Sequence, residues 1–60
     1  RPYAGVLYPF VAQSPQELSI NKNDIVILIQ HVDPDWTEGE LDGKIGIFPT
    51  SYIDIIVDCP

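Results

Sequence analysis

Glycine and proline recur so often along the chain that no long helix fits between them. Proline lacks the backbone N–H that a helix interior needs, and glycine makes an ordered backbone entropically costly. A helix longer than about three turns is therefore excluded. The interrupting positions are Gly5, Pro9, Pro15, Pro34, Gly39, Gly43, Gly46 and Pro49.

The segments between these positions are rich in Val, Ile, Leu, Tyr and Phe, which favour strands. They predict short strands at residues 3–8, 25–30, 36–41, 44–48 and 53–56. Asp42-Gly43 separates two of these runs as a hairpin turn whose two residues both need positive φ. The polar residues 21–24 predict a second turn. This pattern predicts an all-β fold, either a small antiparallel barrel or a sandwich.

The chain is short and has no covalent staple. Its 60 residues make one domain at most, and a chain of this size buries only about 60% of the surface that its unfolded form exposes. Cys59 is the single cysteine, so no intramolecular disulfide can form. The sequence shows no cluster of Cys and His, so we expect no metal site and no cofactor. Stability must come from a closed core.

Acidic residues outnumber basic residues by nine to three, which gives a formal charge of −6. We expect neither nucleic-acid binding nor direct membrane binding, because both depend on Lys and Arg near phosphate groups. The longest apolar run, residues 25–29, is about a quarter of a membrane span. The lone thiol is compatible with a cytoplasmic protein, which is the location we expect.

No catalytic set stands out in the sequence. His31 is the single histidine, and we expect it in a solvated loop. The serines have no histidine nearby in sequence and no G-x-S-x-G setting, and Cys59 has no basic neighbour to activate its thiol. Residues 33–35 do not fit a calcium-binding loop. The sequence therefore predicts a protein that is not an enzyme.

Aromatic residues are more numerous than so small a core requires. Tyr and Trp carry polar ends that usually find water or a hydrogen bond, and Trp36 follows the polar residues 33–35. Aromatic surfaces beside acids suit proline segments in polyproline II form that also carry a cation. The long connection at residues 9–19 has a length that usually indicates function, the alternative being a floppy insertion.

Four segments resemble the motifs of Src-homology 3 (SH3) domains, in the same order and at the same spacing. Residues 6–10, VLYPF, are similar to the ALYDY segment, and residues 17–20, ELSI, to the ELSF that ends the long RT loop. Residues 35–41, DWTEGEL, are similar to the WWxGEL strand, and residues 46–53, GIFPTSYI, to GLFPxNYV. Together they cover nearly the whole chain, so the combination is far more specific than any one motif.

The resemblance implies a five-stranded, partly open antiparallel barrel with a short 3₁₀ turn near residues 49–52. It also implies a shallow groove between the RT loop and the n-Src loop, which is residues 31–35 in this chain. We expect residues 1–60 to be a single SH3-like domain, excised from a larger adaptor, scaffold or signalling protein and monomeric in isolation.

Motif position also implies which residues bind a ligand. Tyr8 and Tyr52 would form one proline-accepting slot, and Trp36 would wall a pocket in which Glu17 meets an Arg or Lys of the ligand. The peptide-binding residues implied by the motifs are Tyr8, Phe10, Glu17, Trp36, Pro49, Ser51 and Tyr52. For Tyr8, Phe10 and Trp36 the alternative is a role in the core. Residues expected in the core are Leu18, Ile20, Val26, Leu28, Ile47, Phe48 and Ile55.

Four positions depart from the family pattern. Phe10 replaces a tyrosine and loses a hydroxyl, and Ser51 replaces an asparagine that can contact the ligand backbone, at a loss of about 1 kcal/mol. Thr37 replaces a second tryptophan at a position that generally faces away from the groove. Pro9 replaces an aspartate at the entry to the loop. These departures predict a modest affinity for peptides.

Five of the nine acids lie within residues 33–42, beside Trp36. We therefore expect the partner's Lys or Arg side chains to reach Asp33, Asp35 and Glu38. Exposed ion pairs are worth about 0–1 kcal/mol each, so they would act on specificity and association rate more than on affinity. The alternative is a solvated acidic face that aids solubility.

The function predicted from the sequence is a non-catalytic interaction module. Its partners would be proline-rich segments of other proteins, with basic PxxP motifs. The alternative is an SH3-like domain that contacts its own chain or a folded partner, in an autoinhibitory or structural role.

Overall fold

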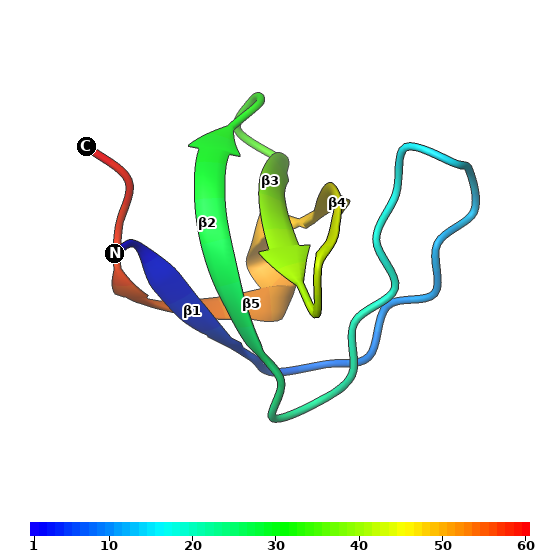
Figure 1. The fold of residues 1–60 in the computed structure, drawn as a ribbon, viewed down its shortest axis with the longest axis horizontal. Helices are drawn as coiled ribbons and strands as arrows, with labels where there is room; N and C mark the ends of the chain where they lie inside the picture. The colour runs from blue at the N-terminus through cyan, green and yellow to red at the C-terminus, as the bar shows by residue number, and fades with distance from the viewer.

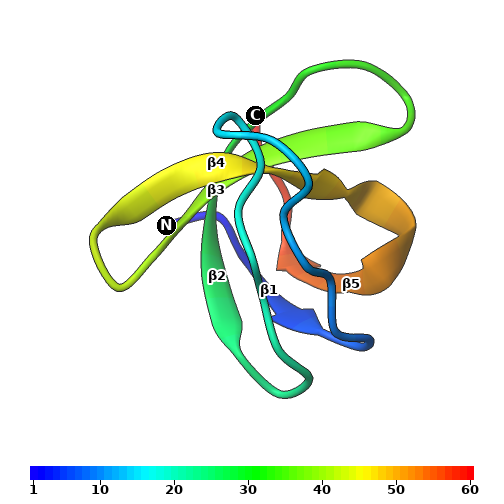
Figure 2. The same cartoon turned by 90° about the vertical axis from the view of Figure 1, so that its right-hand side faces the viewer.

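One twisted antiparallel sheet makes up the fold. The computed structural model describes all residues, 1–60. The elements in chain order are β1 Tyr3–Val6, β2 Ile25–His31, β3 Trp36–Leu41, β4 Lys44–Pro49, the 3₁₀ turn η1 Thr50–Tyr52 and β5 Ile53–Val57 (Figure 1). The strands lie side by side in the order β4-β3-β2-β1-β5, and they curl around a common interior (Figure 2). Since η1 joins β4 to β5 without pairing them, the barrel is partly open, as predicted.

Both predicted turns are present. Asp42 and Gly43 have φ values of 52° and 82°, and the flanking residues of β3 and β4 pair directly across them. In the second turn, the backbone N–H of Asn21 donates to Oδ2 of Asp24 (2.8 Å), and Asn23 adopts a φ of 74°. Asn and Asp tolerate this left-handed conformation and bond their own backbone, so local chemistry determines where each strand begins and ends.

The concave side of the sheet carries the core. Because side chains alternate along a strand, the buried residues of β1, β2, β3 and β4 lie two positions apart, and β5 buries Ile53 alone. The core residues are Ala4, Val6, Leu18, Ile20, Val26, Leu28, Phe48 and Ile53. Most of the residues expected in the core belong to it, but Ile47 and Ile55 are only half-buried. Ile47 alternates with the fully buried Phe48 and therefore points to the other face.

Strand β1 is shorter than predicted. It ends at Val6 instead of continuing to residue 8. Beyond that point the backbone N–H of Leu7 donates to the carbonyl of Tyr52 (2.8 Å), so the chain leaves the strand pairing and turns towards η1.

Strand β2 is longer than predicted, and the expectation that His31 lies in a solvated loop was wrong. β2 continues through His31, which pairs with Thr37 of β3. The n-Src loop is correspondingly limited to residues 32–35. No helix in the structure has the length and the apolar character needed to cross a membrane.

The long connection between β1 and β2, residues 7–24, is tied to the sheet and is not a floppy insertion. Phe10 and Ile20 exchange two backbone hydrogen bonds (2.9 and 3.0 Å) within it. The N–H of Leu18 donates to the carbonyl of Ile47 (2.9 Å), and the N–H of Ile47 donates to the carbonyl of Gln16 (3.0 Å). These bonds cover part of the β4 edge that the open barrel would otherwise expose.

Replacing Gly39 by alanine should destabilise the fold. A Cβ atom there would lie 2.6 Å from the carbonyl oxygen of Ile27 and 2.9 Å from two ring carbons of Phe48. Because one of these groups must move, we expect a loss of about 1–3 kcal/mol in the free energy of unfolding, measured by denaturant titration. The matched control is Gly5→Ala, where nothing lies within 4 Å of the new Cβ. Equal stability of the two variants would contradict this prediction.

Candidate functional site

Four aromatic side chains from three segments meet in one group, the aromatic cluster: Tyr8, Phe10, Trp36 and Tyr52. Ring centroids lie 5.8 Å apart for Tyr8 and Tyr52, and 5.8 Å apart for Phe10 and Trp36. Phe10 also contacts Tyr52, at 6.1 Å. All three contacts are edge to face, a favourable geometry for aromatic pairs. Rings at steep angles to one another do not form a flat plate, and the ring of Tyr8 remains largely exposed.

A side-chain turn positions Trp36. Oδ1 of Asp33 accepts hydrogen bonds from the backbone N–H groups of Asp35 and Trp36, both at 2.8 Å. The N–H of Val32 donates to the carbonyl of Trp36 (2.9 Å), which closes the loop from the other side. An aspartate that bonds the backbone two residues on is a recurrent turn device. The n-Src loop is therefore folded by its own sequence, and Trp36 is presented at the start of β3.

The register of β3 and β4 brings the 3₁₀ turn to the same place. Pro49 pairs directly with Trp36 at the end of the ladder. The backbone N–H of Thr50 donates to the carbonyl of Asp35 (2.9 Å), which joins η1 to the n-Src loop. Pro49 is half-buried and Ser51 is exposed. The structure therefore places the n-Src loop, η1 and the aromatic cluster together.

Comparison with known families identifies the chain. A family model described as a variant SH3 domain matches residues 6–54. This chain belongs to the SH3 domain family.

Its relatives are much longer proteins. The SH3 domain is 47% identical over 53 residues, 88% of its length, to the myosin IC heavy chain of Acanthamoeba castellanii. It is 46% identical over 56 residues, 93% of its length, to mouse vinexin. The matched regions are only 4% and 8% of those two proteins.

Solved structures show the same fold. The C-terminal SH3 domain of myosin IB from Entamoeba histolytica superposes with a TM-score of 0.87 at 36% identity, covering 93% of each chain. The same domain, bound to a peptide named EhFP10(GEF), superposes equally well. The yeast Pin3 SH3 domain gives a TM-score of 0.84 at 35% identity, covering 87% of this chain and 93% of that one.

The acids expected to meet a ligand are partly engaged within the SH3 domain itself. Oε1 of Glu17 accepts a backbone N–H of the RT loop (2.7 Å), and Oδ1 of Asp33 accepts the two N–H groups described above. Oε1 of Glu38 accepts the side-chain amide of Gln30 at 2.9 Å. Asp35 is exposed, and its carboxylate takes part in none of these bonds. Of the four acids expected to meet a ligand, Asp35 is therefore the one whose carboxylate makes no internal hydrogen bond.

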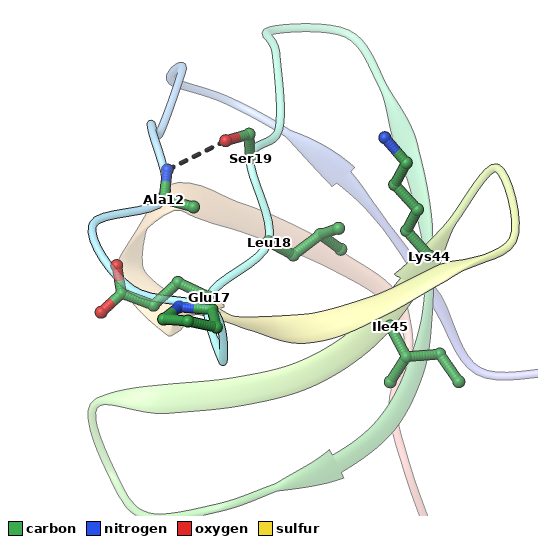
Figure 3. Close-up of a pocket in the computed structure, with 7 residues that line it drawn as sticks. Ala12, Glu17, Leu18, Ser19, Lys44 and Ile45 are labelled. Atoms are coloured by element: carbon green, nitrogen blue, oxygen red, sulfur yellow. Dashed lines mark hydrogen bonds between the residues drawn. The ribbon is translucent and has the colours of Figure 1, made fainter.

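The single pocket of the structure is a hollow between the RT loop and β4 (Figure 3). Leu18 and Ser19 line it from the loop, and Lys44 and Ile45 line it from the strand. No residue of the aromatic cluster contributes to its wall, and Glu17 is the one predicted site residue that does. The structure thus brings the predicted aromatic residues together, while Glu17 lies on the wall of this hollow.

A hydrogen-bonded chain runs beneath β3. His31 Nε2 lies 2.7 Å from Oδ1 of Asp58, and its Nδ1 lies 2.8 Å from Oγ1 of Thr37, which is 2.6 Å from Oγ1 of Thr50. The hydrogen bond to His31, followed by the backbone N–H of Cys59, lowers the pKa of Asp58. An ionised carboxylate only accepts, so Nε2–H donates to it. The Asp–His–hydroxyl order is that of a hydrolase triad, but Thr37 is fully buried, and its hydroxyl cannot reach a substrate.

The sequence analysis did not predict this hydrogen-bonded chain of side chains, because the residues that form it are far apart in sequence. His31 and Asp58 are separated by 27 positions. One signal was available for Thr37: it follows Trp36 on a strand, and alternation turns it inward when Trp36 faces the groove.

Removing the Asp33 side chain should loosen the start of β3. Asp33→Ala deletes the acceptor of two backbone hydrogen bonds, and we expect a loss of about 1–2 kcal/mol in the free energy of unfolding. Denaturant titration monitored by Trp36 fluorescence measures it. Asp33→Asn keeps an acceptor oxygen and should retain most of the stability. If the two variants were equally destabilised, charge rather than the turn would account for the effect.

Proposed function

We propose that this SH3 domain is a non-catalytic interaction module for proline-rich, PxxP-type segments that carry flanking Arg or Lys. The aromatic cluster is the observation that carries the proposal. Its edge-to-face rings leave slots of the kind that accept proline rings, and a segment already in polyproline II form loses little entropy on docking. The peptide complex of the related myosin IB SH3 domain supports the same class of ligand-binding activity.

Each proposed proline-accepting slot would be formed by two aromatic rings that contact each other. Tyr8 and Tyr52 would hold one proline, since their rings meet at 5.8 Å and Tyr8 is 57% exposed. The contact of Phe10 with Trp36 supports the second slot, which Pro49 would complete from the opposite strand. The exposed Ser51 would lie at the edge of the ligand backbone.

The acidic residues would select ligands by charge. Asp35 is exposed, and Glu17 and Asp33 each use one oxygen internally, which leaves a second oxygen for a cation of the ligand. Since such pairs are solvated, their proposed contribution is to specificity and association rate.

We also propose that the domain works as one module of a longer protein. The support is that the matched segment forms 4%, 8% and 16% of three curated relatives, the myosin IC heavy chain, vinexin and endophilin-A of Drosophila melanogaster.

Trp36→Ala should weaken peptide binding by at least about thirtyfold, because truncating an aromatic anchor costs about 2 kcal/mol or more. The measurement is isothermal titration with a synthetic peptide that carries a PxxP core and one flanking Arg. Ile45→Ala is the matched control, since it removes a side chain that is 61% exposed and lines the hollow. We expect it to leave affinity unchanged.

Amide chemical shifts measured during the peptide titration distinguish the proposed site from the alternatives. Saturable shifts at Tyr8, Trp36 and Tyr52 would support the aromatic cluster as the site. Loss of binding in Ile45→Ala with retention in Trp36→Ala would place the peptide in the hollow instead. No response at millimolar peptide would favour a domain that contacts its own chain or a folded partner.

The exposed acids should affect the association rate of the peptide more than its dissociation constant. Asp35→Asn should reduce the association rate of the basic peptide severalfold at low salt, and by less at high salt, because screening removes the attraction. Stopped-flow mixing at two ionic strengths measures this. Asp54→Asn removes an exposed acid of β5 and is the matched control. A salt-independent dissociation constant in the unaltered domain would contradict the proposed acidic recognition.

A further inference from the structure

Three metal-binding side chains converge where the C-terminal segment, residues 58–60, meets the end of β2. The ligand atoms of His31, Asp58 and Cys59 all lie within 4.8 Å of one another. Neighbouring residues of an extended segment point to opposite sides, so Asp58 and Cys59 would not share a ligand in a continued strand. The chain leaves β5 at Val57, and in the irregular segment that follows, the N–H of Cys59 donates to Oδ1 of Asp58 at 2.7 Å and both side chains lie near His31.

We propose that His31, Asp58 and Cys59 form a three-ligand site for Zn²⁺ that fastens the C-terminal segment to β2. Imidazole nitrogen, thiolate sulfur and carboxylate oxygen are the three donor types that zinc takes in proteins. Bond lengths of 2.0–2.3 Å around a tetrahedral ion place ligand atoms roughly 3.5 Å apart, so modest shifts in an irregular segment are enough. Water would take the fourth position.

The charges of the site suit a divalent cation. The carboxylate of Asp58 and the thiolate of Cys59 together balance the two charges of Zn²⁺, while His31 binds as a neutral imidazole. No lysine or arginine takes part in a salt bridge at this cluster, since the only ion pair is between His31 and Asp58. Two of the three side chains are open to solvent, at 33% for His31 and 57% for Asp58, and Cys59 is half-buried against the core, so an ion can enter from the side of His31 and Asp58.

The surroundings also hold the histidine in the required orientation. Metal-binding histidines usually donate their second ring N–H to a fixed acceptor, which sets the tautomer. Here Nδ1 of His31 faces Oγ1 of the fully buried Thr37, at 2.8 Å. The Thr37 hydroxyl can accept from Nδ1 and donate to Thr50, 2.6 Å away, so both groups stay satisfied when the ion replaces the proton on Nε2.

The test is titration of the reduced 60-residue domain with Zn²⁺ by calorimetry, and with Co²⁺ as a spectroscopic probe. We expect one metal ion per chain, a monomer in sedimentation, and a thiolate-to-cobalt charge-transfer band with the visible absorption of a tetrahedral ion. Cys59→Ser should abolish the charge-transfer band. His31→Gln and Asp58→Asn should each raise the dissociation constant for Zn²⁺ by at least about tenfold, the loss that even an outer-shell partner can cause.

A charge-matched control separates a built site from general attraction to an acidic surface. Asp54→Asn removes the same charge as Asp58→Asn from a nearby position in sequence and should leave zinc affinity unchanged. Equal losses in the two variants, retention of zinc affinity in Cys59→Ser, one ion per two chains, or no binding would each overturn the proposal. None of the four variants changes a fully buried residue or a member of the aromatic cluster, and Cys59→Ser keeps the size of the half-buried side chain that packs against the core, so circular dichroism should show the native fold throughout.

Discussion

The ring of Phe48 lies against Gly39, and this contact determines which residues of β3 and β4 face the core and which face away from it. A Cβ atom at position 39 would meet ring carbons of Phe48 at 2.9 Å, so only glycine leaves room for the ring to be fully buried. Because side chains alternate on each strand, burying Phe48 turns the next residue, Pro49, the other way. Pro49 pairs with Trp36, and both are therefore presented at the end of the β3–β4 ladder where η1 begins.

Hydrogen bonds made outside the aromatic cluster hold its rings in place. The Asp33 turn holds the start of β3, the bond from Thr50 to Asp35 holds η1 against the loop, and the bond from Leu7 to Tyr52 holds the start of the RT loop. None of these bonds requires a ligand. Rings that already stand in place lose little further freedom on binding, so their contact area is not offset by a large ordering cost. A small sheet can in this way hold together aromatic rings from three distant segments, as the proposed binding surface requires.

The sequence predicted those parts of the fold that depend on local chemistry. Asp42-Gly43 gave the hairpin because both residues accept positive φ, and the four motifs located the aromatic residues that meet in space. It failed where long-range pairing decides the outcome. The sequence around His31 predicts a loop, but His31 pairs with Thr37 of β3 and is therefore part of β2. The convergence of Cys59 with His31 depends on how the chain leaves β5, which no spacing rule specifies.

The hydrogen-bonded chain through His31 and the aromatic cluster both include a residue of η1, yet the energetic coupling between them should be weak. Thr50 donates its backbone N–H to Asp35 in the n-Src loop and shares a hydroxyl hydrogen bond with Thr37. When His31 is neutral with its proton on Nε2, Thr37 donates to Nδ1; when a cation occupies Nε2, Thr37 accepts from Nδ1. At Thr37 and Thr50 the two arrangements differ only in proton positions, and the shifts that the ion requires are confined to the C-terminal segment. Energetic coupling requires an element with two distinct arrangements that both sites favour differently. A reversed hydroxyl provides too small a difference to move η1, so the C-terminal segment and the groove should act independently.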